Sequence, residues 1–420
     1  MNVWQRKLMD GDVLFTEDGK KVEIIYPGRP NDGRGADFRD AVISTGEGIV
    51  KGDIEIHIRS SGWMEHGHHR DSAYNRVILH VVMWHNAKSL TRLQNGRVVP
   101  VLALENYIDI QDKRWFGTES AGHSLNVPCS ECFRQQDKHT LLEFIEDSGE
   151  KRFLEKAAGF QKDITRMGAG QSLYRGIMGA LGYSRNKQPF LELAHRLSLQ
   201  TLESVAGDRI SGEDYLTRQQ SLLLGTAGLL SERYEYEYTE NRLDNKRLER
   251  PESLRAIFRN VEPMSAGDWQ LYKIRPNNSP VRRLIAMSYL LLRYKEKGLL
   301  DGLVGFVGEI PENRVYRGLE RGLKVNALGS GRAADIVVNV LLPFTFAWSK
   351  CTSRPELGKK SLYLYRHYPG TPVNSVEKHM TEQLGLSRDL VNSAARQQGL
   401  IHIYNNLCTQ GRCEDCFLKR

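Results

Sequence analysis

The stretch from Gly35 to His57 decides the fold of the first part of the chain. It opens with Gly35-Ala-Asp37-Phe and closes with Asp53-Ile-Glu55-Ile-His57. The alternation in the closing segment predicts a strand whose Glu55 and His57 lie on one face, with the isoleucines buried behind them. Asp37 begins the preceding strand. A twisted hairpin would therefore bring the carboxylates of Asp37 and Glu55 together.

Two carboxylates beside a base suit a metal-dependent hydrolase of phosphodiesters. We expect Mg²⁺ or Mn²⁺ to bind between Asp37 and Glu55. His57 would orient or deprotonate the attacking water, or stabilise the charge that develops on the phosphate. The alternative interpretation is an ordinary amphipathic hairpin that carries surface charges.

Histidines are concentrated directly after this strand. Six of the 12 histidines lie between residues 57 and 85: His57, His66, His68, His69, His80 and His85. Neutral imidazole is the commonest transition-metal ligand, so a separate zinc site is one interpretation. In the other interpretation His80 is a core residue, His68 and His69 are exposed, and no second metal is needed. The candidates for supporting roles around the catalytic residues are Asp53, His66, His68, Asp71 and His80.

The coarse secondary structure predicts an α/β fold for this region. A short helix is expected near residues 3–9, followed by strands at 22–26, around 40–43 and at 50–58. A short helix near 69–75 and a fourth strand at 77–84 complete the order. Helix, three strands, helix and strand is the order of a restriction-endonuclease-like core, in which a mixed sheet is flanked by helices.

Motifs along nearly the whole chain resemble a bacterial family catalogued only as a domain of unknown function. The matching N-terminal motifs are Gly35-Ala36-Asp37-Phe38, Gly52–His57, Trp63 with His66 and His68, Asp71, Tyr74 and Leu79–Val82. Further along they are Leu181-Gly-Tyr183 with Asn186, Arg275-Pro-Asn277 with Pro280, Asn339 with Pro343, and the closing cysteines.

The N-terminal pattern in turn resembles the PD-(D/E)xK nuclease superfamily. That resemblance implies a metal-dependent nuclease in which Asp37 and Glu55 bind the ion. The chain departs from the superfamily pattern at two positions. Ala36 stands where proline is frequent, and His57 stands where lysine is usual. The second departure bears on the chemistry, because histidine is neutral at pH 7 unless a neighbour raises its pKa.

The length of 420 residues suits two domains, which we expect at residues 1–150 and 151–420. Apolar residues at three- and four-residue spacing predict a mostly α-helical second domain. The longest apolar run, residues 335–348, is too short and too interrupted to cross a membrane, and no secretory segment opens the sequence. We therefore expect a cytoplasmic protein.

The charge is distributed unevenly between these two parts. Residues 1–150 carry 18 Lys and Arg against 23 Asp and Glu, whereas the remainder carries 41 against 28. A basic module joined to an acidic catalytic one suits a nucleic acid partner, most simply DNA. Arg275, Arg282 and Arg283 lie around a predicted helix start and could bind a phosphate there. The alternative is a well-capped helix with surface arginines.

Five of the six cysteines are clustered. They are Cys129, Cys132, Cys408, Cys413 and Cys416. The CxxC spacing is typical of thiolate pairs that bind one ion, so structural Zn²⁺ or a 4Fe–4S cluster is expected. Some nucleases of the resembled superfamily use a similar plan, with one distant cysteine and a C-terminal trio. Unliganded thiols are the alternative.

These patterns favour a metal-dependent nuclease of DNA or RNA. Two other functions fit the same residues: a nucleic-acid-binding protein with a degenerate site, and a zinc-dependent hydrolase of a small substrate.

Overall fold

The computed structural model describes residues 1–5, 7, 9, 13–87, 89–108, 129, 137–205, 210–230, 254–271, 274–311 and 315–417. The chain divides into two compact units. Unit 1 comprises residues 1–149, 373–392 and 396–420, and unit 2 comprises residues 150–372 and 393–395. The division after residue 149 is close to the expected boundary, but the C-terminal residues pack in unit 1 and not with the helical region.

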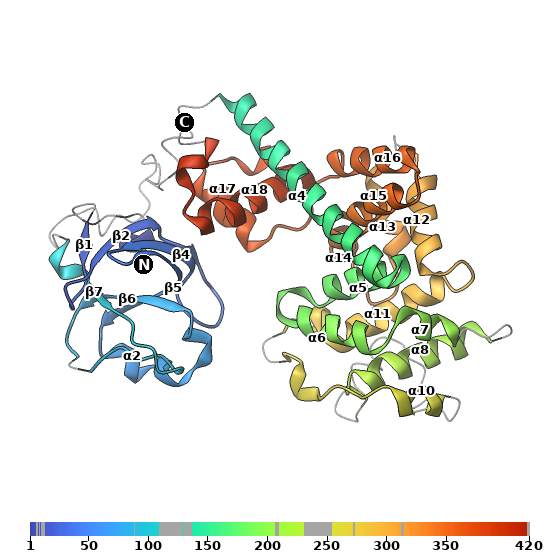
Figure 1. The fold of residues 1–420 in the computed structure, drawn as a ribbon, viewed down its shortest axis with the longest axis horizontal. Coiled ribbons are helices and arrows are strands. Elements are labelled where there is room, and N and C mark those ends of the chain that lie inside the picture. The colour runs from blue at the N-terminus through green and yellow to red at the C-terminus, as the bar shows by residue number, and fades with distance from the viewer. Residues whose placement is uncertain are drawn as a thin grey trace. The chain divides into compact units, whose positions relative to one another are not determined.

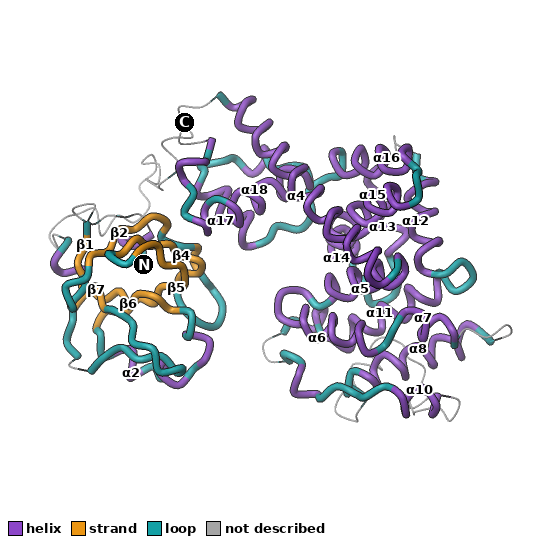
Figure 2. The backbone as a smooth tube through the Cα atoms, viewed as in Figure 1, coloured by secondary structure: helices purple, strands orange, loops and turns teal. Residues whose placement is uncertain are grey.

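Unit 1 contains a mixed sheet (Figures 1 and 2). Its strands are β1 (Leu14–Phe15), β2 (Lys21–Tyr26), β3 (Arg29–Pro30), β4 (Phe38–Thr45), β5 (Gly48–Arg59), β6 (Val77–Trp84) and β7 (Val101–Ala103). The order is β1-β2-β4-β5-β6-β7, and β3 pairs with β4. The strand pairs β1–β2, β2–β4 and β4–β5 are antiparallel, whereas β5–β6 and β6–β7 are parallel. The predicted α/β class is therefore confirmed.

The four predicted strands correspond to β2, β4, β5 and β6, because each carries the expected apolar alternation or buried run. The first helix, α1 (Asn2–Gln5), is shorter than the predicted one. Instead of a helix at 69–75 the chain forms α2 (Gly62–Glu65) and two 3₁₀ turns, η1 (His68–Arg70) and η2 (Ser72–Tyr74). The short turns cross from β5 to the parallel β6.

Two helices near the C-terminus complete unit 1. Residues of α17 (Ser375–Gln383) and α18 (Ala394–Asn406) share an apolar cluster with Tyr26 of β2 and Val42 of β4. Tyr26 also bonds His379 of α17, with 2.6 Å between the phenol oxygen and Nε2. This packing is the reason that the end of the chain belongs to the sheet-containing unit.

Unit 2 is mostly helical, as expected. Its helices are α5 (Ala169–Leu181), α6 (Tyr183–Arg196), α7 (Leu199–Ser204), α8 (Gly212–Thr226), α10 (Arg255–Asn260), α11 (Pro280–Arg293), α12 (Leu299–Glu309), α13 (Val315–Leu323), α14 (Ser330–Ile336), α15 (Leu342–Cys351) and α16 (Pro355–Arg366). The unit boundary falls within the long helix α4 (Lys138–Met167). One apolar cluster runs through these helices. Within the described residues, no helix combines the length and the apolar character that a membrane span requires.

Candidate metal centre

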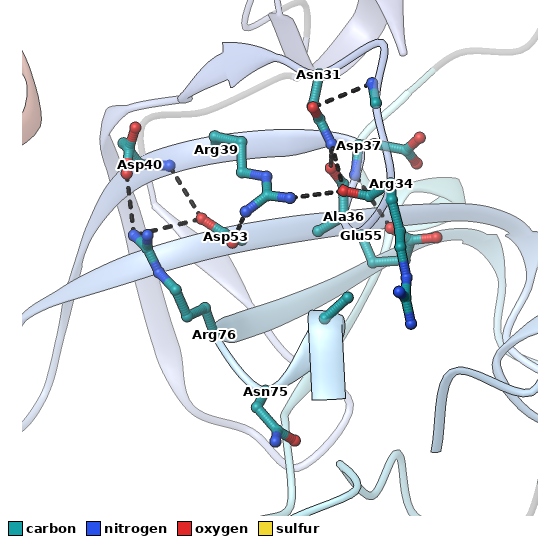
Figure 3. Close-up of polar contacts among 12 residues, drawn as sticks. Asn31, Arg34, Ala36, Asp37, Arg39, Asp40, Asp53, Glu55, Asn75 and Arg76 are labelled. Atoms are coloured by element: carbon teal, nitrogen blue, oxygen red, sulfur yellow. Dashed lines mark hydrogen bonds and ion pairs between the residues drawn. The ribbon is translucent and has the colours of Figure 1, made fainter. Parts of the chain in front are cut away.

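The carboxylates of Asp37 and Glu55 lie side by side at one end of the β4–β5 hairpin (Figure 3). The Asp37 backbone N–H donates to Glu55 Oε2 at 3.1 Å, and the Ile56 N–H donates to Asp37 Oδ2 at 3.0 Å. These reciprocal bonds fix both side chains relative to the sheet. The structure thus brings together the two carboxylates that the sequence pairs.

Both carboxylates are partly or wholly removed from water. Glu55 is 5% exposed, and burial, helped by the charge of Asp37, raises its pKa above the usual value. Burial raises the pKa of Asp37 as well. Two adjacent carboxylates with raised pKa values are stabilised by a positive charge between or beside them. A bound cation would supply that charge.

Two imidazoles from β5 and from the turn that follows it approach Glu55, and a third, that of His66, approaches His57. His57 Nε2 lies 3.1 Å from His66 Nδ1 and 3.6 Å from Glu55 Oε1. His68 Nε2 lies 3.1 Å from the same Glu55 oxygen. Potential ligand atoms of His57, His66 and His68 all lie within 4.8 Å of one another. Within the described part of the chain, these three histidines form the group whose ligand atoms are close enough together to bind one metal ion.

His68 Nε2 is buried and has no hydrogen bond of good geometry within the described residues, although a carboxylate oxygen is close. The ring is 8% exposed and is held between Trp63 and Tyr74, whose ring centroid lies 3.9 Å away. A buried nitrogen lone pair that faces a carboxylate is unfavourable unless a proton or a cation lies between them. A proton on His68 Nε2 or a bound cation would make this contact favourable.

Behind His57 a line of hydrogen bonds sets its orientation. His57 Nδ1 lies 2.9 Å from His80 Nε2, and His80 Nδ1 lies 3.1 Å from Thr91 Oγ1. Burial lowers the pKa of His57 to about 4 and that of His80 to about 3, so both rings are neutral at pH 7. With one proton on each Nδ1, the His57 Nε2 lone pair faces Glu55 and His66.

Gly62, at the start of α2, allows this arrangement and was not singled out from the sequence. A Cβ at this position would lie 3.0 Å from His57 Cδ2. The backbone of α2 therefore packs directly on the imidazole.

Tyr74, which packs on His68, was also not assigned to the site from the sequence. Burial, with the charges of Glu55, Asp71 and Asp37, raises its pKa to about 12.

Two supporting candidates lie outside this cluster. Asp53 is fully buried and lies 3.5 Å from both Arg39 Nη1 and Arg76 Nη2, while its Oδ1 accepts from the Asp40 N–H (Figure 3). Asp71 bonds Arg34 at 2.9 Å and caps the η2 turn through the Ala73 N–H. The carboxylates of Asp53 and Asp71 thus have structural partners. Of the other supporting candidates, His66 and His68 lie with His57 in the histidine trio, and His80 contacts His57.

The predicted thiols also lie in unit 1. Burial raises the pKa of Cys408 well above its usual value, and the neighbouring Cys129, Cys416 and Cys413 add to the effect. Gly411 has a φ of 67°, which is the tight turn that the cluster of three C-terminal cysteines requires. Cys132 lies outside the described residues. The metal–thiolate site remains a prediction.

The predicted phosphate-binding arginines lie in unit 2. Arg275 precedes a 3₁₀ turn at Pro276–Asn278, and Arg282 is half-buried in α11. Arg283 is only 5% exposed and donates from Nη2 to Asn278 Oδ1 at 2.8 Å. A solvated surface role is thereby excluded for Arg283.

Fold and site define a two-unit α/β and helical protein whose mixed sheet carries a carboxylate–histidine cluster. The chain belongs to the family described as "Protein of unknown function (DUF2851)", whose model matches residues 1–305. No curated protein and no solved structure matches the chain.

Proposed function

We propose that the chain is a metal-dependent phosphodiester hydrolase of the nuclease type, with its metal centre at Glu55, His57, His66 and His68. The mutual closeness of the three imidazoles, with Glu55 Oε1 near two of them, supports this most strongly. Ligands bound at about 2.1 Å around one tetrahedral ion lie roughly 3.4 Å apart. The distances from His57 Nε2 to His66 Nδ1 and Glu55 Oε1, and from His68 Nε2 to Glu55 Oε1, are 3.1, 3.6 and 3.1 Å.

The chemistry of the donors favours a transition metal. Imidazole and carboxylate together suit Mn²⁺ or Zn²⁺ better than Mg²⁺, which prefers oxygen ligands. Such an ion polarises a phosphoryl oxygen and lowers the pKa of bound water. Asp37, whose backbone N–H donates to Glu55, would accept a hydrogen bond from the attacking water or bind the ion as a further ligand.

His57 has a different role in this proposal from the lysine of the resembled superfamily. Because burial lowers its pKa to about 4, the ring is neutral at pH 7 and adds no positive charge. It contributes a lone pair instead, as a ligand or as a base. The charge that lysine would supply must then come from the metal ion.

The choice of a phosphodiester substrate rests on the two carboxylates, the strand order and the charge. Unit 2 carries 35 Lys and Arg against 24 Asp and Glu, a net charge of +11. Such an excess favours a polyanion such as DNA or RNA. A zinc-dependent hydrolase of a small substrate is the second candidate, and the three converging imidazoles are the observation in its favour.

Cleavage assays with the full chain test the proposal. Single- and double-stranded DNA, RNA and a chromogenic carboxylic ester are incubated with Mg²⁺, Mn²⁺ or Zn²⁺, and with EDTA. We expect nucleic acid cleavage with Mn²⁺ or Zn²⁺ and none in EDTA. Ester hydrolysis alone would instead support the second candidate, and binding of DNA without cleavage by any metal would indicate a degenerate site.

A matched pair of variants locates the activity. Glu55→Gln removes a proposed ligand, so the rate should fall by more than the roughly 10–100-fold that loss of an outer partner costs, with DNA affinity retained. Glu47→Gln, an exposed glutamate in the turn of the same hairpin, should leave the rate unchanged. Full activity of Glu55→Gln would contradict the proposed centre.

A further inference from the structure

Arg34 is a cation of unit 1 that the hydrolase proposal does not use. It belongs to the loop between β3 and β4, three residues before Asp37. Its guanidinium donates to Asp71 twice, from Nη2 to Oδ1 at 2.9 Å and from Nε to Oδ2 at 3.3 Å. Asp71 precedes the η2 turn and follows His68 by three residues. The side chain of Arg34 therefore connects the segment of Asp37 to the segment of His68.

Both of these segments contact Glu55. The Asp37 N–H donates to Glu55 Oε2, and His68 Nε2 lies 3.1 Å from Glu55 Oε1. Three residues of extended chain span at most about 11 Å, so the backbone of Arg34 lies within that distance of Asp37. Figure 3 shows Arg34, Asp37 and Glu55 at the same end of the hairpin. Arg34 thus lies at the edge of the proposed metal centre.

The pair with Asp71 occupies only one edge of the Arg34 guanidinium. Arginine has five N–H groups in a planar fork, and Asp71 accepts from one on Nε and one on Nη2. Within the described residues, the other three N–H groups have no acceptor. The side chain is 71% exposed, so these donors are open to water. An edge formed by Nη1 and Nη2 suits two oxygens of one phosphate group.

The loop that carries Arg34 is braced by hydrogen bonds. Asn31 Oδ1 accepts the Gly33 N–H at 3.2 Å, and Asn31 Nδ2 donates to the Ala36 carbonyl at 2.8 Å (Figure 3). Arg39 of β4 donates from Nη2 to the Arg34 carbonyl at 2.6 Å. The backbone of Arg34 is therefore fixed before a ligand binds, which reduces the entropy lost on binding.

Gly35 allows the loop to pack closely on its supports. Its φ is 96°, a conformation that favours glycine. A Cβ at this position would lie 2.7 Å from Arg39 Nη2 and 3.2 Å from the Ala73 carbonyl oxygen. Ala73 belongs to the η2 turn that Asp71 caps. The motif that supplies Asp37 thus also places Arg34 against this turn.

We propose that Arg34 binds the two non-bridging oxygens of a backbone phosphodiester of the nucleic acid substrate, at the edge of the metal centre. This inference rests on the proposed function, which names the phosphodiester as the substrate. Asp71 keeps one edge of the guanidinium and the phosphate binds the other, so no existing hydrogen bond has to break. Arg34 adds a positive charge to that of the metal ion, whereas neutral His57 adds none.

Binding of a fluorescein-labelled single-stranded oligonucleotide to the full chain tests this proposal without catalysis. Fluorescence anisotropy is measured in EDTA over a series of salt concentrations. Arg34→Gln should bind roughly three- to tenfold more weakly at low salt, and its slope of log affinity against log salt should be smaller in magnitude by about 0.7, because one phosphate contact is lost. Arg34→Lys keeps the charge and the wild-type slope, but it should bind more weakly because the fork is lost.

Lys20→Gln is the matched control. Lys20 is an exposed cation of unit 1 that pairs with Asp18, and it precedes β2 at the end of the β2–β4 pair that lies away from Asp37. This variant should keep both the affinity and the slope. The proposal is overturned if the wild type does not bind the oligonucleotide, if Arg34→Gln binds as the wild type does, or if Lys20→Gln loses as much affinity.

The result is separable from that of the hydrolase proposal. Weaker binding by Arg34→Gln in a chain that cleaves no substrate would support the phosphate contact and contradict the hydrolase. Cleavage by a wild-type chain whose Arg34→Gln variant binds with unchanged affinity and slope would support the hydrolase and contradict the phosphate contact.

Discussion

The two carboxylate oxygens of Glu55 have different partners. Oε2 accepts the Asp37 N–H, whereas Oε1 faces the imidazoles of His57 and His68. Because one oxygen is fixed by the backbone, the position of the other is determined before any ligand arrives. In the proposed metal centre, such preorganisation would lower the cost of metal binding and orient the ion relative to Asp37.

His80 is expected to position His57 without touching metal or substrate. His80→Leu removes the acceptor of the His57 Nδ1–H, so affinity for Mn²⁺ or Zn²⁺ should fall by about 10–100-fold. His80→Gln retains an acceptor oxygen and should recover part of that affinity, which a purely structural role would not explain. His139→Gln, at an exposed histidine of α4, is the control. Equal metal affinities of His80→Leu and wild type by calorimetry would refute the positioning role.

At the scale of the elements, β5 carries both the site and a separate anchor. Asp53, two residues before Glu55, connects β5 to Arg39 of β4 and Arg76 beside β6. The Asp40 N–H also donates to Asp53, and Asp40 has a φ of 60° where the β4–β5 register shifts. The anchor holds the three strands together where they support Glu55 and His57.

Asp53→Asn should therefore destabilise unit 1 more than Asp71→Asn. Asp53 is fully buried, and loss of its charged hydrogen bonds should reduce the free energy of unfolding by about 2–3 kcal/mol. The Asp71–Arg34 pair is more exposed, so its contribution should stay below about 1 kcal/mol. Urea unfolding followed by tryptophan fluorescence measures both. Equal losses would contradict an anchoring role for Asp53.

The strands of unit 1 could be predicted from the sequence because their signals are local. The alternation around Glu55 and the buried run 77–84 fix β5 and β6 without reference to other segments. The pairing of Asp37 with Glu55 followed from the short connection between their strands. Convergence of the three imidazoles was harder to foresee, because it requires the parallel β5–β6 pairing and the turn through α2 and η1.

At the scale of the whole molecule, sequence proximity was a poor guide to packing. The C-terminal helices lie more than 300 residues from β2, yet Tyr26 and His379 share a hydrogen bond. Long-range contacts of this kind have no local signature in one sequence.

His379 should make stability depend on pH. Burial lowers its pKa to about 4, against 6.5 in an unfolded chain, so the folded state holds the neutral ring. The stabilisation is complete above pH 6.5 and is lost as the pH falls toward 4, by about 3 kcal/mol in total. His379→Gln should show a weaker decline of thermal stability between pH 6.5 and 4 than wild type. Parallel pH profiles would contradict this assignment.

The location of a bound ion tests the central claim most directly. A crystal of the full chain soaked in Mn²⁺ should give an anomalous scattering peak about 2.0–2.2 Å from Glu55 Oε1 and from the nearest nitrogens of His57, His66 and His68. The peak should be absent in a His68→Asn crystal grown and soaked in the same way. Absence of a peak at these residues in the wild type, or its persistence in His68→Asn, would contradict the proposed metal centre.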